Sequence, residues 1–295
     1  MLSNNDGCVV ARSKEAKSLG IPDLHAFFKI EQQLEANNVH IFSSNYTLYG
    51  DISHRVMETL KRFSPEIEVY SIDEMFLSFA NLPVDLKAYG KEIKETVWKE
   101  VRMPVCVGMA PTKTLAKLAN HAAKKIDKAN GVCLLDNPRK WQWVLKRIPV
   151  TKVWGIGSKL GRRLNAMKIY SAYELATADP KYLRKQFSVN VERTITELNG
   201  VSAIPLEEIP EPKQQIYCTR SFGEKPTELQ PLLQAVSGYT SRAAEKLRKQ
   251  QHFASSIQVF INTSPYEQNY YGNSITVQLP YPTCLLYTSP SPRDS

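Results

Sequence analysis

The sequence predicts an α+β protein that is built from more than one domain. Strand-like and helical segments alternate between residues 46 and 135, and residues 139–200 are helical with short turns. A Pro- and Glu-rich stretch at 204–214 has no helical period, which is typical of an extended linker. A second unit of strands and a helix follows this stretch. A length of 295 residues agrees with at least two domains.

The elements of the first half follow from hydrophobic spacing. Residues 46–63 carry apolar side chains at helical spacing, and residues 88–101 do so again. Residues 67–79 are β-branched and aromatic, which favours a strand or a hairpin. Further along the chain we expect a strand at 105–108, a helix that Thr112 caps and that runs to about Ile126, and a strand at 132–135.

The second unit contains a strand–helix–strand–strand pattern. The expected elements are a strand at 215–222, a helix at 227–250, and strands at 254–263 and 274–280. A ferredoxin-like β-α-β-β-α-β unit would need a further helix and a further strand. Residues 284–295 are rich in Ser and Pro, and we expect them to form a disordered tail.

Charge and composition narrow the class of protein. Lys and Arg number 38 and Asp and Glu 29, so the net charge is +9. The excess is concentrated in residues 136–200, with 13 basic and 5 acidic side chains, whereas residues 68–100 hold 7 acidic and 4 basic ones. This distribution suggests a polyanionic partner held near a carboxylate site, although an ordinary basic surface is the alternative. No apolar run is long enough for a membrane span, and five scattered cysteines agree with a cytoplasmic location.

Two adjacent carboxylates, Asp73 and Glu74, lie inside the most strand-like stretch of the chain. Neighbouring side chains of a flat strand point to opposite faces, so the two can share a ligand only if the chain kinks or turns there. Paired carboxylates can hold hard divalent cations such as magnesium. The alternative is a solvated pair in a hairpin turn, and these two residues alone favour that alternative.

A basic helix and a glycine turn follow the carboxylates. Lys113, Lys117, His121 and Lys124 fall near one face of the expected helix, which is useful if an anion lies along it and is otherwise a solvated face. The segment Val153–Gly157, with glycines at 155 and 157, fits a helix-hairpin-helix whose backbone amides approach a DNA phosphate. A tight turn between two helices is the alternative. The cations expected to contact DNA are Lys159, Arg162, Arg163, Arg220 and Lys225.

Taken together and in this order, these motifs resemble those of the Y-family of translesion DNA polymerases, and within it the UmuC group. The resemblance runs from about residue 2 to residue 283. The stretches that carry it are LSNNDGCVVARSKEAKSLGI (2–21), FSSNYTLYGDISHRVM (42–57), YSIDEMF (70–76), VGMAPTKTLAKLANHAAKK (107–125), VWGIGSKL (153–160), TRSFGE (219–224) and TSPYEQNYYGNS (263–274).

The resemblance implies a right-hand polymerase that performs error-prone, template-directed DNA synthesis in the SOS damage response. By motif position the domains are fingers (1–45), palm (46–135), a thumb with the helix-hairpin-helix (136–203), a linker (204–214) and a ferredoxin-like little finger (215–283). The implied cofactor is a pair of Mg²⁺ ions. The implied partners are primer–template DNA, a dNTP, an accessory subunit of the UmuD type, a recombinase filament and a sliding clamp.

The resemblance also assigns roles to individual residues. Asp73 and Glu74 match two of the family's three metal-binding carboxylates, and they would be catalytic. Lys17 and Lys124 match positions that contact the incoming triphosphate, whereas Lys14 stands where many relatives carry a triphosphate-binding tyrosine. Gly155 and Gly157 match the hairpin that grips the DNA backbone.

The pattern departs from the family at both ends of the matching region. The first residues already match the fingers, so the strand that carries the third aspartate has no counterpart, and the match stops near Thr283. We therefore expect a fragment that is truncated at both ends and is catalytically inactive or impaired. The alternative is a non-catalytic, sequence-independent DNA-binding module that uses only the hairpin and the basic helix.

Overall fold

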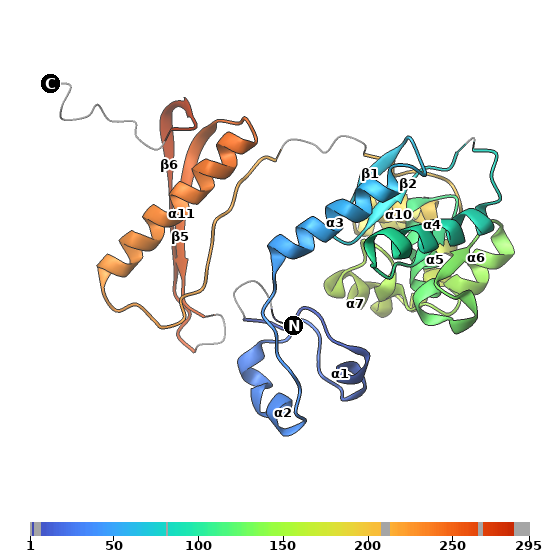
Figure 1. Ribbon diagram of the computed structural model, residues 1–295, viewed down its shortest axis with the longest axis horizontal. Helices are drawn as coiled ribbons and strands as arrows, with labels where there is room; N and C mark the ends of the chain where they lie inside the picture. The colour runs from blue at the N-terminus through green and yellow to red at the C-terminus, as the bar shows by residue number, and fades with distance from the viewer. Residues whose placement is uncertain (1, 3–6, 81, 208–212, 265–267, 286–295) are drawn as a thin grey trace. The chain divides into compact units, whose positions relative to one another are not determined.

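The computed structural model describes residues 2, 7–80, 82–207, 213–264 and 268–285. The chain divides into two compact units, one formed by residues 45–210 and the other by residues 1–44 and 211–295. Figure 1 shows the elements of both units along the chain. None of the described helices is long and apolar enough to cross a membrane.

Two pairs of short strands organise the first half of the 45–210 unit. Strand β1 (Ile67–Val69) runs antiparallel to β2 (Met75–Leu77), and β3 (Val107–Met109) runs parallel to β4 (Val132–Leu134). Helix α3 (Tyr46–Leu60) precedes them and ends three residues earlier than its hydrophobic spacing predicts. Helix α4 (Leu86–Val101) packs against both β3 and β4. The strand–helix alternation expected from the sequence is therefore confirmed.

Helix α5 (Lys113–Lys125) is the element that carries most of the expected lysines. The Thr112 hydroxyl accepts a hydrogen bond from the Leu115 amide at 3.3 Å and so caps the helix, as the sequence predicts. The apolar face of α5 is fully buried. Gly108 of β3 is necessary for this packing, because a Cβ atom there would overlap the backbone of Ala116 and Asn120 in α5. The close contact between β3 and α5 therefore fixes the position of the helix that carries Lys113, Lys117 and Lys124.

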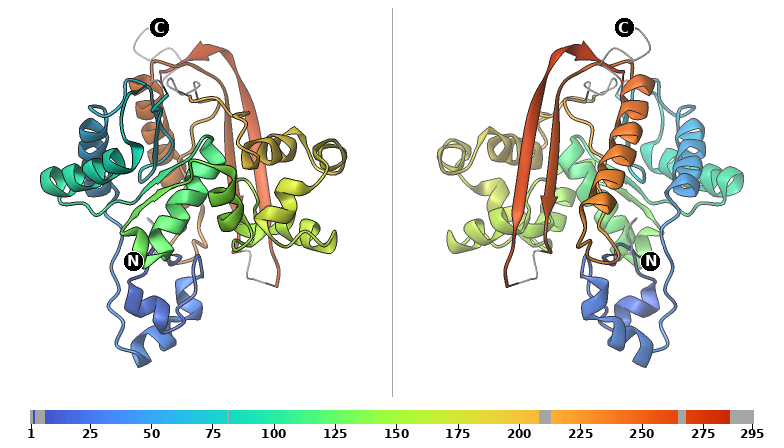
Figure 2. Two further views of the ribbon diagram at one scale, coloured as in Figure 1. Left: turned by 90° about the vertical axis from the view of Figure 1, so that its right-hand side faces the viewer. Right: turned by 90° about the vertical axis from the view of Figure 1, so that its left-hand side faces the viewer.

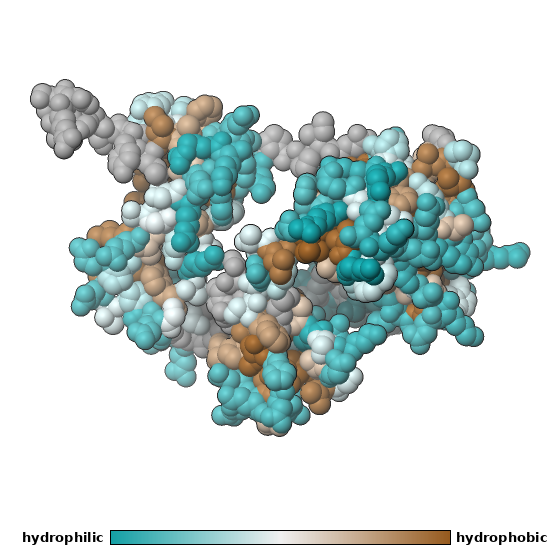
Figure 3. Space-filling view, viewed as in Figure 1, coloured by the Kyte–Doolittle hydropathy of each residue, from teal (hydrophilic) through white to brown (hydrophobic). Residues whose placement is uncertain are grey.

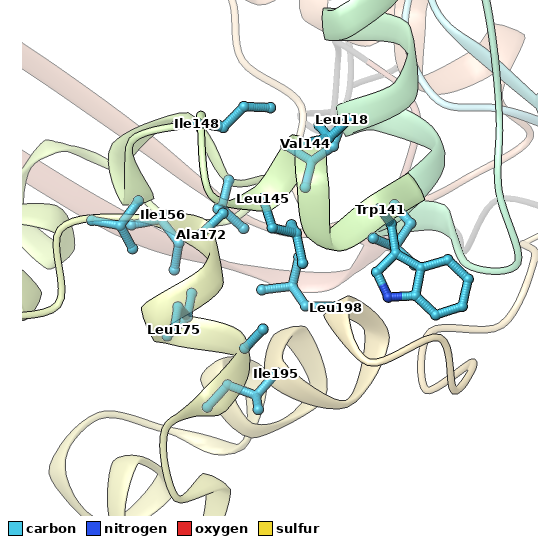
Figure 4. Close-up of a cluster of buried hydrophobic side chains, with 14 of the residues drawn as sticks. Leu118, Trp141, Val144, Leu145, Ile148, Ile156, Ala172, Leu175, Ile195 and Leu198 are labelled. Carbon is cyan, nitrogen blue, oxygen red and sulfur yellow. The ribbon is translucent and has the colours of Figure 1, made fainter. Parts of the chain in front are cut away.

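The remaining helices of this unit share one hydrophobic core. They are α6 (Pro138–Leu145), α7 (Ser158–Ala166), α8 (Ala172–Thr177), α9 (Pro180–Gln186) and α10 (Val189–Leu198). Figure 4 shows the core, to which α6, α8 and α10 contribute Leu145, Leu175 and Ile195. The core also contains Leu118 of α5, so it continues across the expected palm–thumb boundary at residue 135. The face of this unit seen in Figure 3 is mostly hydrophilic.

The beginning of the expected linker is part of the 45–210 unit. The buried Glu197 carboxylate accepts hydrogen bonds from the backbone amides of Ala203 and Ile204, at 2.8 and 3.1 Å. The buried Glu68 carboxylate accepts another from the amide of Glu207, at 2.8 Å. Residues 203–207 are therefore a strap that is fixed to this unit, so the extended linker expected from residue 204 is anchored at its beginning. The composition of the strap does not reveal these hydrogen bonds, because the Glu68 carboxylate that anchors Glu207 is 139 positions away in the sequence.

Residues 1–44 form small helices around a minor core. Helix α1 (Lys14–Ser18) begins after Ser13, whose hydroxyl caps it, and α2 (Glu31–Ala36) follows a short 3-10 turn. The core consists of Leu2, Val9, Ile21, Ile30 and Leu34. Asp6, within the 2–21 motif, lies outside the described residues.

The C-terminal part contains a long helix and a hairpin. Helix α11 (Leu229–Lys249) precedes β5 (Ala254–Asn262) and β6 (Gly272–Thr283), which pair antiparallel and run side by side in Figure 2. The expected strand at 215–222 is wrong, since those residues have no regular secondary structure. No side chain of α11 is buried. Apart from Cys284 and Leu285, the expected tail lies outside the described residues.

Candidate active site

The closed end of the β1–β2 hairpin presents the two adjacent carboxylates. The chain turns between Tyr70 and Glu74, where the amides of Tyr70 and Ser71 both donate to the Glu74 carbonyl, at 3.2 and 3.1 Å. The Ser71 hydroxyl donates to Asp73 Oδ1 at 2.7 Å. Asp73 is exposed and Glu74 is half-buried. The turn that a shared ligand requires is therefore present, and it removes the constraint that would send the two side chains to opposite faces.

Two ion pairs join this hairpin to α5. Lys117 Nζ lies 2.9 Å from Glu74 Oε2, and Lys113 Nζ lies 2.5 Å from Glu68 Oε2. The Lys113–Glu68 pair is buried, with side-chain exposures of 9% and 7%, whereas the Lys117–Glu74 pair keeps 21% and 33%. Lys113 also donates to the carbonyl of Pro205 in the strap, at 3.1 Å. The lysine face is thus not simply solvated, because its first two ammonium groups contact carboxylates of the same chain.

The other two members of the basic face are arranged differently. Lys124 is exposed and lines a pocket of about 340 Å³ together with Lys94 and Cys106. The described residues show no contact between Lys124 and either carboxylate of the hairpin. Burial lowers the pKa of His121, and the positive charges of Lys125, Lys152 and Lys124 lower it further. The C-terminal half of α5 is therefore an electropositive surface.

An aromatic cluster lies against the two paired lysines, and sequence reasoning missed it. Lys117 Nζ lies 4.3 Å from the ring centre of Tyr70 and 5.3 Å from that of Trp154, both within cation–π range. Phe76 lies 4.9 Å from Lys113 Nζ, and the Trp154 indole N–H donates to the Tyr70 hydroxyl at 2.9 Å. The signal in the sequence was that Tyr70 and Phe76 flank the carboxylate motif and that Trp154 directly precedes Gly155.

The glycine turn is built as the sequence predicts. Gly155 has φ +84°, which favours glycine, and Gly157 precedes the first turn of α7, whose amides have no side-chain cap. Gly161 lets α7 approach closely, since a Cβ atom there would lie 2.5 Å from Thr151 Cγ2 in the 3-10 turn Val150–Lys152. An uncapped and exposed helix start is suited to binding a phosphate.

The basic side chains beside this turn are not equivalent. Lys159 and Arg162 are exposed, and neither has an ion pair or a side-chain hydrogen bond within the described residues. Arg163, in contrast, donates to the Gln186 carbonyl at 2.9 Å and lies 4.4 Å from the ring centre of Phe187. Arg163 therefore holds α7 against α9, and it is the least available of the three cations for DNA.

The remaining expected contacts lie in the other compact unit. Lys17 is exposed on α1, and Arg220 and Lys225 are exposed in the segment before α11. Arg220 lines a pocket of about 510 Å³ with Arg242 and Lys246 of α11. The structure brings Glu74, Lys117 and Trp154 together, but it leaves these three expected contacts in a separate unit from Asp73 and Glu74.

Comparison with solved structures identifies the class of protein to which this fold belongs. The chain has the fold of the Y-family DNA polymerases: it covers 80% of a Y-family DNA polymerase chimera of Dbh and Dpo4, with 93% of this chain aligned, a TM-score of 0.66 and 22% identity. A second solved structure, an insertion ternary complex of Dbh DNA polymerase, aligns with 91% of this chain and 75% of its own, with a TM-score of 0.55 and 21% identity.

The chain belongs to the impB/mucB/samB family. Residues 1–121 match the family profile, residues 138–169 the family's HHH motif and residues 213–287 its C-terminal domain. It is 46% identical over 288 residues to Protein UmuC of Salmonella typhimurium strain LT2, covering 96% of this chain and 68% of UmuC. It is also 26% identical over 263 residues to DNA polymerase IV 1 of Bacillus subtilis strain 168, covering 86% and 61%. The resemblance to Y-family polymerases and the UmuC group is therefore confirmed.

Proposed function

We propose that this chain performs template-directed DNA synthesis of the translesion type, with Asp73 and Glu74 at the reaction centre. The observation that carries the proposal is the Glu74 carboxylate, which the hairpin turn presents 2.9 Å from the Lys117 ammonium on a basic helix. Membership of a family related to DNA polymerase IV 1 supports it. Error-prone synthesis in the SOS response is the corresponding cellular role, and the cytoplasm the corresponding location.

The chemistry of Asp73 and Glu74 in the β1–β2 hairpin fits a Mg²⁺ site. Both side chains offer the hard carboxylate oxygens that Mg²⁺ prefers, and one of them already contacts a cation. In the part of the chain that the structure describes, no three His, Cys, Asp or Glu side chains gather as a metal cluster. Asp73 and Glu74 would therefore supply two ligands. The chemistry that divalent ions held there would supply is charge neutralisation at the reacting phosphate and activation of the attacking hydroxyl.

The other groups bind and orient the substrates. Lys124 and Lys17 would neutralise the triphosphate of the incoming dNTP, because ammonium groups stabilise phosphate charge. The amides at the start of α7, with Lys159 and Arg162, would hold a DNA phosphate, and Arg220 and Lys225 would follow the backbone further along. The partners in this proposal are primer–template DNA and a dNTP. By family membership, the proposed protein partners are a UmuD-type subunit, a recombinase filament and a sliding clamp.

Primer extension with Mg²⁺ tests the proposal. We expect Asp73→Ala and Glu74→Ala each to reduce synthesis by about a hundredfold or more, since phosphoryl transfer depends strongly on charge neutralisation at the phosphate. The matched control is Glu66→Ala, which removes an exposed carboxylate from the same segment. Synthesis that is insensitive to both substitutions would contradict the assignment. The yield of the unsubstituted chain also decides between the proposed activity and the impaired synthesis expected from the sequence: robust synthesis that Asp73→Ala abolishes would contradict impairment.

A non-catalytic DNA-binding module is the second candidate function. It is favoured by the exposed Lys159 and Arg162, which form no ion pair within the described residues and stand beside the uncapped start of α7. This function needs no carboxylate at the hairpin. DNA binding that persists in Glu74→Ala while synthesis is undetectable in the unsubstituted chain would support it over the first candidate.

A further inference from the structure

The Lys117 ammonium is itself a cation paired with the Glu74 carboxylate. Its ammonium nitrogen is 2.9 Å from Oε2, and the described residues give it no second carboxylate. The side chains remain 21% and 33% exposed, so solvent ions can reach the pair. The neighbouring Lys113–Glu68 pair is built differently, because it is buried and is also bonded to Pro205 and Glu207 of the strap. One pair is therefore locked, while the other is accessible to exchange.

Aromatic rings hold the Lys117 ammonium in place without neutralising it. The Tyr70 ring lies 4.3 Å away and the Trp154 ring 5.3 Å away, and the Trp154 indole N–H fixes the Tyr70 hydroxyl at 2.9 Å. Cation–π contacts favour the charged ammonium but offer it no oxygen. Glu74 therefore remains the one anionic partner of Lys117 among the described residues.

We propose that Lys117 is a positioning residue, a tethered counter-cation that holds Glu74 in place until a divalent ion binds and that competes with this ion for the carboxylate. The inference rests on the proposed function, since it takes Glu74 as a metal ligand. A cation 2.9 Å from one oxygen reduces the negative potential that a second cation meets at the same group. Removal of the ammonium consequently strengthens divalent-ion binding instead of weakening it.

Lys117→Met tests this competition. The unbranched thioether can lie beside the Tyr70 and Trp154 rings, where sulfur–aromatic contact is favourable, so the local fold is retained. Lys117→Gln repeats the test with a polar side chain of similar length. Lys125→Met is the matched control, because it removes the same charge from an exposed position on the same helix, at the end far from the pair with Glu74.

The readout is Mn²⁺ binding, measured by the electron paramagnetic resonance signal of the free ion during titration of the full chain. We expect Lys117→Met to tighten Mn²⁺ binding by about fivefold, which corresponds to the loss of one partly screened charge contact. Lys125→Met should change the affinity by less than about twofold, because an exposed charge at longer range is screened. A purely structural role for Lys117 would leave the affinity unchanged or weaken it.

The Glu74→Gln variant distinguishes failure of this inference from failure of the proposed function. Unchanged or weaker Mn²⁺ binding in both Lys117 variants, together with loss of binding in Glu74→Gln, overturns the inference and leaves the proposed function intact. Binding that Glu74→Gln does not alter overturns both, since Glu74 is then not a ligand. Tighter binding in both Lys117 variants and loss of binding in Glu74→Gln is the expected result.

Discussion

The buried Glu197 carboxylate accepts a hydrogen bond from the Thr114 amide at 2.9 Å and so joins α10 to the first turn of α5. Its other oxygen accepts from Ala203 and Ile204 of the strap. The carbonyl of Glu197 completes the junction by accepting from the Thr112 hydroxyl at 2.9 Å. One side chain thus connects the basic helix, the last helix of the core and the segment that leaves it.

Loss of this carboxylate should destabilise the 45–210 unit. We expect Glu197→Ala to lower its free energy of unfolding by about 3 kcal/mol, because one buried and two part-buried amides lose a charged acceptor. Urea denaturation followed by circular dichroism measures the change. Glu192→Ala is the control, since its pair with Arg184 is partly exposed and should contribute less than about 1 kcal/mol. Similar losses in the two variants would contradict the role given to Glu197.

Substitutions at the two glycines of the helix-hairpin-helix should affect stability and DNA binding separately. Gly155→Ala places a side chain at φ +84°, so we expect a loss of about 1–2 kcal/mol in unfolding free energy. Gly157 has φ −75° and open space within 4 Å of where a Cβ atom would stand, so Gly157→Ala should be stable but should hinder a phosphate that approaches the α7 amides. Thermal denaturation and fluorescence anisotropy with labelled duplex measure the two effects. Equal DNA affinity in Gly157→Ala and the parent chain would count against phosphate binding by the helix-hairpin-helix.

Binding to DNA should depend on salt through Lys159 and Arg162. Neutralising both by Ala should weaken binding of any duplex sequence and reduce the slope of log K against log salt concentration by about 2, one unit for each phosphate contact. A Lys181→Ala variant, altered at an exposed lysine on α9, should keep the parent slope. Anisotropy titrations at several salt concentrations measure the slopes, and an unchanged slope in the double variant would sink the prediction.

Arg163 should behave unlike these two residues. Because it bonds to the Gln186 carbonyl and stacks on Phe187, Arg163→Ala should lower stability by about 1–2 kcal/mol and change the salt slope little. The same denaturation and anisotropy experiments apply. A stable Arg163→Ala variant with a clearly reduced slope would return this residue to the set of DNA contacts.

The lowered pKa of His121 gives stability a pH dependence with a defined sign. Burial holds the folded pKa below the value of about 6.5 for the unfolded chain, so between the two values the unfolded state binds more protons. Stability should therefore be full above about pH 6.5 and fall as the pH drops through this window. His121→Gln should show a shallower loss between about pH 7 and 5 in urea denaturation. An identical pH profile would refute the assignment.

Local patterns in the sequence were sufficient for the elements that make their contacts nearby. The helix of α5, its Thr112 cap and its buried face follow from spacing alone, and so does the turn at Gly155. The strap was missed because its amides bond to Glu68 and Glu197, and extended segments leave no periodic signal. The strand expected at 215–222 did not form, since β-rich composition needs a paired neighbour as well.

The candidate site divides in the same way. The adjacent carboxylates and the lysine face can be read from single motifs, but the pairing of Lys117 with Glu74 depends on how the hairpin meets α5. Tyr70 and Trp154 are 84 positions apart, so their hydrogen bond follows only from the tertiary fold. Charge counting also treated Arg162 and Arg163 alike, whereas a helix turns neighbouring side chains in different directions.

The anchored strap determines where this polypeptide can be recombined with its relatives. A chimera joined near Ala203 would place a foreign backbone against the carboxylates of Glu68 and Glu197, and a proline or a shifted path there would leave buried charges without their amide donors. A junction placed after Glu207 keeps every one of those bonds within a single parent. Exchange of the C-terminal module should therefore succeed only on the far side of that residue.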